Sequence, residues 1–210
     1  MKNLIIILTI AGTVTFCSNS RATITNASWS ATGNPIVNAS YGWNSGSDLL
    51  TMSGQQNTVP IDLAGQVQTD TVADPTLFLG GSVNNDTSFA WTTYQVNVYM
   101  AIPFNFTGTP GVSNPSSDWY VGSVVQPSTP LLTGPYAGDY EGTLNFSDGT
   151  PLAIGAELDF NYAIHFSGST DYAFTQEMIP NAVPEPSALG LLAVSGPALA
   201  MLWRSKRKSA

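Results

Sequence analysis

The chain has 210 residues and an uneven distribution of charge, with six basic and 14 acidic side chains. The region from Thr23 to Ala182 contains 13 of the acidic residues and no lysine or arginine, so its formal charge is −13. Without cationic side chains this region cannot neutralise phosphate groups, which excludes nucleic-acid binding and argues against phosphoryl chemistry. Cations are the natural small partners of such a surface. The basic residues all lie near the ends of the chain, at Lys2, Arg21, Arg204, Lys206, Arg207 and Lys208.

The N-terminal residues have the pattern of a secretory signal peptide. Lys2 provides a positive start, and the apolar stretch from Leu4 to Phe16 has signal-peptide length but is too short to cross a membrane. The small residues of Ser20-Arg21-Ala22 predict cleavage after Ala22. Because the only cysteine, Cys17, would leave with the signal peptide, we expect no disulfide and no thiolate chemistry in the mature protein.

The remaining region, residues 23–182, has a length that suits one domain. From Thr23 to Leu50 it favours short strands joined by tight turns, and Asp74-Pro75 precedes a further element over Thr76–Val83. The strongest strand pattern runs from Ser88 to Ile102, where apolar residues alternate. Two aromatic residues at its start have the opposite register, which predicts a bulge near Thr92-Thr93.

The second half of the domain begins with a stretch rich in Pro, Gly and Ser, Thr107–Gly138, which we expect to be a long loop that includes one candidate strand at Asp118–Val121. A strand follows over Tyr140–Phe146 and leads into a predicted turn at Ser147–Gly149. Apolar residues then alternate from Leu158 to Phe166, and a last strand follows from Tyr172. No apolar helical period lasts three turns, so the fold class predicted is all-β, an antiparallel β-sandwich of eight to ten strands.

The last 28 residues, Val183–Ala210, combine three signals in a fixed order. They begin with Val183 and the rigid tripeptide Pro184-Glu185-Pro186, whose prolines hold the chain extended. An apolar segment over residues 187–203 follows, about 25 Å long as a helix, which predicts one short transmembrane helix. A basic stop then predicts a cytoplasmic C-terminus. It consists of Arg204, Lys206, Arg207 and Lys208.

This order of signals resembles the PEP-CTERM sorting domain of Gram-negative bacteria. The resemblance covers residues 183–210 only, about an eighth of the chain. It implies recognition by an exosortase-type membrane protease near Pro184-Glu185-Pro186. It also implies export through the inner membrane, temporary anchoring by the C-terminal helix, and delivery to the cell surface or the extracellular matrix.

Calcium is the metal that the acidic residues near predicted turns would suit, because it prefers oxygen ligands. None of these residues fits the twelve-residue loop of an EF-hand. The candidate ligands are Asp139, Glu141, Asp148, Glu157 and Asp159.

Two enzymatic readings are weaker. The only histidine, His165, faces the polar side of its strand, and a serine–histidine–aspartate triad would have to use it. A carboxylate pair could hydrolyse glycosides. The pairs available are Asp139 with Glu141 and Glu157 with Asp159, each two residues apart on a strand and therefore about 7 Å apart.

The sequence therefore leaves three functions open for the exported domain. We expect a non-catalytic structural or adhesive protein of a surface layer or biofilm matrix, without a cofactor. A calcium-assisted carbohydrate-binding module is the first alternative, in which exposed aromatic residues stack on sugar rings. A glycan hydrolase with a carboxylate pair is the second. The aromatic candidates for sugar stacking are Trp29, Trp43, Trp91 and Trp119.

Overall fold

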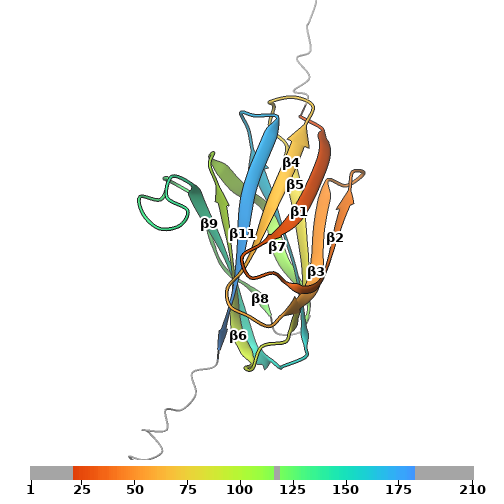
Figure 1. The fold of residues 1–210 in the computed structure, drawn as a ribbon, viewed down its shortest axis with the longest axis vertical. Coiled ribbons are helices and arrows are strands. Elements are labelled where there is room, and N and C mark those ends of the chain that lie inside the picture. Colours follow the sequence, from red (N-terminus) through yellow and green to blue (C-terminus); the bar gives the residue numbers. More distant parts are fainter. Residues whose placement is uncertain (1–20, 116–118, 183–210) are drawn as a thin grey trace, which may run out of the picture.

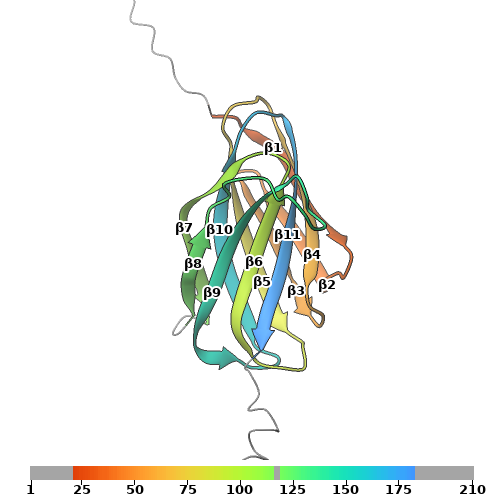
Figure 2. The same cartoon turned by 90° about the vertical axis from the view of Figure 1, so that its left-hand side faces the viewer.

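A computed structural model of the protein describes residues 21–115 and 119–182, and these residues form two β-sheets packed face to face (Figures 1 and 2). In sheet order, the six-stranded sheet consists of β1 (Ile24–Thr32), β4 (Ile61–Thr69), β11 (Asp171–Ala182), β6 (Trp91–Met100), β9 (Tyr140–Leu152) and β8 (Tyr120–Val125). The five-stranded sheet consists of β2 (Val37–Asn44), β3 (Leu49–Gln56), β5 (Thr76–Asn85), β10 (Glu157–Phe166) and β7 (Phe104–Asn114). No helix occurs in these described ranges, which confirms the predicted all-β class.

One pair of neighbouring strands departs from the predicted antiparallel arrangement. β3 and β5 are parallel, with Leu50 opposite Leu79. The strand between them in the sequence, β4, lies in the six-stranded sheet. The chain therefore leaves the five-stranded sheet after β3, crosses to the other sheet, and returns in its original direction as β5.

Alternation of apolar and polar residues explains why these segments form strands around a shared core. On β10 the five apolar residues from Leu158 to Phe166 point inward and are at most 3% exposed, as the alternation predicts. Burial of each such side chain stabilises the fold by about 1.5–3 kcal/mol. The polar residues between them face outward, so the outer face of the five-stranded sheet displays side chains of β10.

The predicted bulge at the start of β6 is present. Against β11, Trp91 pairs with Ala182 and Thr93 with Asn181, so Thr92 is an extra residue on β6. With this extra residue, Trp91 and Tyr94 both point into the core although they are three positions apart, and both are fully buried. Their rings lie 5.1 Å apart between centroids.

Two expectations about loops were wrong. The stretch Thr107–Gly138 contains most of β7 and all of β8, which overlaps the possible strand at Asp118–Val121, so the loop after β8 comprises residues 126–139. Both strands are outermost in their sheets, where one side of the backbone needs no partner and Gly and Pro are tolerated. The turn predicted at Ser147–Gly149 is also absent, because β9 continues to Leu152.

All four edge strands are interrupted by irregular pairing with their single neighbour. The register shifts occur between Ile24 and Asn26 on β1, and between Val37 and Ser40 on β2. A shift also occurs between Val121 and Ser123 on β8, and β7 is shifted twice against β10. Such bulges twist an edge and make it a poor template for another strand.

Two tyrosine–glutamine hydrogen bonds connect the sheets through the core. The Tyr94 hydroxyl on β6 donates to Gln56 Oε1 on β3 at 2.8 Å. On the other side, the Tyr162 hydroxyl on β10 donates to Gln176 Oε1 on β11. All four side chains are at most 3% exposed, so these bonds fix how the two sheets face each other.

The targeting segments lie largely outside the described residues. This applies to residues 1–20 and to the whole tail from Val183 to Ala210, including the Pro184-Glu185-Pro186 motif and the predicted helix over 187–203. Within the part of the chain that the structure describes, no helix is long and apolar enough to cross a membrane.

Candidate functional site

The outer face of the five-stranded sheet carries a row of small residues across its strands. The cross-strand partners in this row are Gly42 on β2, Thr51 on β3, Gly80 on β5, Asn161 on β10 and Gly111 on β7. Three of the five have no side chain, so the face is hollowed along this row. We call this row the glycine row.

Larger side chains stand on both sides of the glycine row. One neighbouring row holds Leu49, Phe78 and Ala163, and the other holds Ser53, Ser82 and Asp159. Two adjoining hollows of about 500 Å³ each lie over this part of the sheet, and Leu49 and Asn161 line both. Together they form one groove that crosses the strands, which we call the transverse groove.

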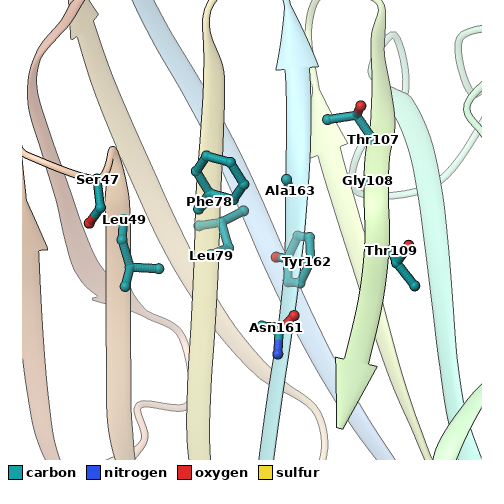
Figure 3. A pocket seen from close by; sticks show the side chains of 10 residues that line it. All are labelled: Ser47, Leu49, Phe78, Leu79, Thr107, Gly108, Thr109, Asn161, Tyr162 and Ala163. Atoms are coloured by element: carbon teal, nitrogen blue, oxygen red, sulfur yellow. The ribbon is translucent and has the colours of Figure 1, made fainter.

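One end of the transverse groove is apolar and aromatic. Figure 3 shows Phe78 on β5 standing beside Leu49 on β3, with Asn161 on β10 and Thr107 on β7 along the same hollow. The ring of Phe78 is 49% exposed, although it is a large apolar side chain in the middle of a sheet. An exposed ring next to hydroxyl and amide groups is the combination that binds a sugar, which has an apolar face and a polar rim.

The other end of the groove is acidic and contains one of the predicted carboxylate pairs. Glu157 and Asp159 lie on β10 and line the groove beside Ser53 on β3. Ser82 on β5 donates a hydrogen bond to Glu157 Oε1. Asp159 Oδ1 is buried and has no hydrogen-bond donor.

The pKa of Asp159 reflects this uncompensated charge. Burial raises the pKa, the hydrogen bond from Ser82 lowers it, and the hydrogen bond and charge of neighbouring Glu157 raise it again, so that the net shift is upward. The two carboxyl groups therefore lie within hydrogen-bonding reach of each other.

The predicted calcium ligands are not brought together. Glu141 lies on β9 in the six-stranded sheet, whereas Glu157 and Asp159 lie on β10 in the other sheet, and Asp139 precedes β9. The side chain of Asp148 is outside the described residues. Among the side chains that the structure does describe, no three acidic, histidine or cysteine groups are close enough to hold a metal ion.

His165 is part of a small polar contact at the end of β10. Its Nδ1 is 3.2 Å from the hydroxyl of Thr76, and its Nε2 is 3.9 Å from the carboxylate of Asp74. The Asp74 side chain is 62% exposed, and within the described residues the partner of the ring is a threonine rather than a serine. This contact links β10 to the start of β5.

The tryptophans proposed for sugar stacking are mostly core residues. Trp29, Trp91 and Trp119 are at most 7% exposed, and Trp43 is partly buried against the core. The exposed ring of the groove is Phe78, which the sequence analysis did not single out. Its only signal in the sequence is that it lies between two apolar residues, Leu77 and Leu79, at a position where alternation calls for a polar residue.

A second polar cluster lies on the outer face of the six-stranded sheet. Tyr99 donates to Glu141 at 3.0 Å and to Glu177 at 2.9 Å, and Asn97 donates to Glu177 at 2.9 Å. The ring of Tyr136, from the loop over residues 126–139, stacks on Tyr99 with centroids 3.9 Å apart. Figure 1 shows this loop beside β9.

Charge accumulates in this cluster without a cation. Asp62 is the direct cross-strand partner of Glu177, and its Oδ1 is buried without a donor. Burial raises the pKa of Asp62, and the charge of Glu177 raises it further, against a hydrogen bond from Tyr136 that lowers it. Burial and the same carboxylates raise the pKa of Tyr136 to about 12.

The predicted cleavage site lies at the start of the described chain. Ala22 is buried, and the backbone N–H of Thr23 donates to Asp70 Oδ1 at 2.8 Å. In return, the N–H of Asp70 donates to the carbonyl of Thr23. Thr23 is therefore fixed to the end of β4 immediately before β1 begins.

Comparison with known proteins finds no matching family model, no matching curated protein and no matching solved structure.

Proposed function

We propose that the exported domain is a non-catalytic adhesive module that binds extracellular polysaccharide in the transverse groove. The observation that carries this proposal is the glycine row, which hollows the centre of the five-stranded sheet beside the exposed ring of Phe78. The groove crosses several strands at about 4.8 Å each, so it suits an extended chain ligand better than a compact one.

The lining of the groove supports a carbohydrate ligand. It contributes hydroxyl groups from Thr51, Ser53 and Thr107 and the exposed amide of Asn161. These groups both donate and accept hydrogen bonds, as sugar hydroxyl groups do. Phe78 provides an apolar face on which a sugar ring would stack.

The targeting signals in the sequence support a location outside the inner membrane. A signal peptide over residues 1–22 would start export, and the tail over residues 183–210 would hold the protein in the membrane until an exosortase-type protease cuts near Pro184-Glu185-Pro186. The domain would then reach the cell surface or the extracellular matrix, where polysaccharide is its proposed partner. Calcium is a candidate only for a single carboxylate pair, not for a site built from all five predicted ligands.

Substitution in the groove tests binding. Gly80→Val fills the glycine row, and Phe78→Ala removes the exposed ring. We expect both variants to lose retention on columns of the host's own extracellular polysaccharide. Ala173→Val adds bulk to an exposed position of β11 on the other sheet and should bind normally. If Gly80→Val binds as the unchanged protein does, the groove is not the adhesive site.

Intact mass tests the sorting part of the proposal. A species from the host's extracellular fraction that begins at Thr23 and ends near residues 184–187 is expected. A protein found only in the membrane fraction with its C-terminus intact would mean that the tail is a permanent anchor.

A further inference from the structure

The acidic end of the transverse groove holds more negative charge than its surroundings compensate. Glu157 and Asp159 share the nearby hydroxyl of Ser82, and Asp159 Oδ1 lies beneath the groove surface without a donor. No lysine or arginine occurs anywhere between Thr23 and Ala182, so the domain itself cannot supply a counter-charge. Removing carboxylates from water without a partner is costly, and a cationic group above the pair would recover part of that cost.

We propose that the transverse groove takes a polysaccharide bearing free amino groups, with an ammonium group seated over Glu157 and Asp159. This inference rests on the proposed function and specifies its ligand. The amino group would donate to the Glu157 carboxylate at this end of the groove. The rest of the chain would pass along the glycine row towards Phe78.

The geometry favours an ammonium group over a calcium ion. Calcium takes six to eight oxygen ligands, and it binds tightly only where several are carboxylates. This end of the groove offers two carboxylates, and no third acidic group joins them within the described residues. An ammonium group has only three protons to donate, so two carboxylates and one neighbouring hydroxyl group satisfy it.

The charge of the domain also excludes acidic polysaccharides from this site. A uronate or sulfated sugar would bring a like charge next to Glu157 and Asp159. Recognition of such ligands uses arginine or lysine, and the groove has neither. Among extracellular polysaccharides, the pair therefore selects for cationic chains.

A matched pair of ligands tests the inference on the exported domain, within which the described sheets and buried core lie, over residues 22–182. The ligands are a β-1,4-linked glucosamine tetramer and the same tetramer with every amino group acetylated, titrated by calorimetry at about pH 6, where the amines are largely protonated. We expect the amine form to bind at least about tenfold more tightly, a preference that falls as salt is added. The double variant Glu157→Gln/Asp159→Asn keeps the shape of the groove and should abolish the preference.

The control variant is Asp171→Asn, which removes one exposed charge from the other sheet and should keep the preference. If the two tetramers bind equally well, or only the acetylated one binds, the ammonium subsite is wrong while polysaccharide binding stands. A preference that survives in the double variant would reflect the total charge of the domain and would also overturn the inference. If neither tetramer binds, or calcium saturates the site at micromolar concentration, the groove is not a site for amine-bearing sugars.

Discussion

The carboxylates of this domain have no lysine or arginine to pair with. The backbone nitrogen of Thr23 is the first group that could become a cationic partner. This nitrogen lies 2.8 Å from Asp70 Oδ1. Cleavage after Ala22, as the sequence predicts, would convert this amide into an ammonium group and so create an ion pair. The start of β1 would then be held by the only strong cation in the mature domain.

The contribution of this pair can be measured on two versions of the domain. One begins at Thr23 with a free amino group, and the other has the same amino group acetylated. Asp70→Asn should lower the melting temperature of the free-amine version more than that of the acetylated version. Since both residues are exposed, we expect the two versions to differ by at most about 1 kcal/mol in the free energy of unfolding that the substitution costs, and by less in high salt. Equal effects in the two versions would contradict the ion pair.

The two tyrosine–glutamine bonds of the core differ in how well they are satisfied. Gln56 accepts from Tyr94 and donates to two backbone carbonyls, whereas Gln176 Nε2 is buried without an acceptor. Tyr94→Phe should therefore destabilise the domain by about 1–3 kcal/mol, because Gln56 Oε1 would lose its donor. The double change Tyr162→Phe/Gln176→Met removes both partners and should be nearly neutral.

Denaturant unfolding with matched m-values would measure both effects. A loss for the double change as large as that for Tyr94→Phe would mean that Gln176 has a partner after all, such as a buried water molecule.

At the scale of elements, β5 places two consecutive glycines on opposite faces with opposite consequences. A Cβ atom at Gly80 would meet Thr51 Cγ2 at 3.5 Å, an ordinary contact on the open face. A Cβ atom at Gly81 would lie 2.3 Å from Phe160 Cζ in the core. Gly81→Ala should therefore cost about 1–3 kcal/mol through overpacking, whereas Gly80→Ala should leave stability unchanged or raise it slightly.

Thermal unfolding of the two alanine variants provides the measurement, and each serves as the control for the other. Similar melting temperatures would show that Phe160 moves aside, and the packing argument would then fail.

Strand periodicity in the sequence was sufficient for the fold class but not for the site. The alternation from Leu158 to Phe166 predicts which face of β10 is buried, and the irregular register near Thr92-Thr93 predicts the bulge. Neither pattern contains information on which strands are neighbours. The glycine row exists only because the chain returns as β5 and pairs in parallel with β3. The paired residues are about 30 positions apart in the sequence, and no local sequence pattern predicts such a pairing.

The same limit explains why the predicted site residues were only partly right. Glu157 and Asp159 lie on one strand, so their closeness follows from spacing alone. Phe78 was missed because an apolar residue between apolar neighbours suggests a strand buried on both faces rather than an exposed ring.

The whole molecule should respond to pH in the opposite direction from a protein whose carboxylates have pKa values lowered by salt bridges. Burial raises the pKa of Asp48, Asp62 and Asp159 above the ordinary value of 3.8. A raised pKa means that the folded state holds the proton more tightly, so each group stabilises the fold fully below pH 3.8 and loses that contribution as pH rises through its folded pKa. The domain should therefore become more stable as pH falls from 7 towards 4.

Melting temperature measured across this range tests the prediction. Asp62→Asn should reduce the slope, because it removes one of the groups that titrate. A melting temperature that decreases steadily as the pH is lowered from 7 to 5 would show that hydrogen-bonded carboxylates elsewhere in the domain dominate the pH dependence instead.

The register shifts on all four edge strands have a consequence for a crowded surface coat. Proteins commonly guard their edges with lysine, and this domain has none between Thr23 and Ala182. In this domain the register shifts of the edge strands hinder the addition of a strand from another copy instead. Copies bound side by side to a polysaccharide, as we propose, would therefore stay separate even at high density, and any cohesion of the coat would come from the sugar chains rather than from fibrils of the protein.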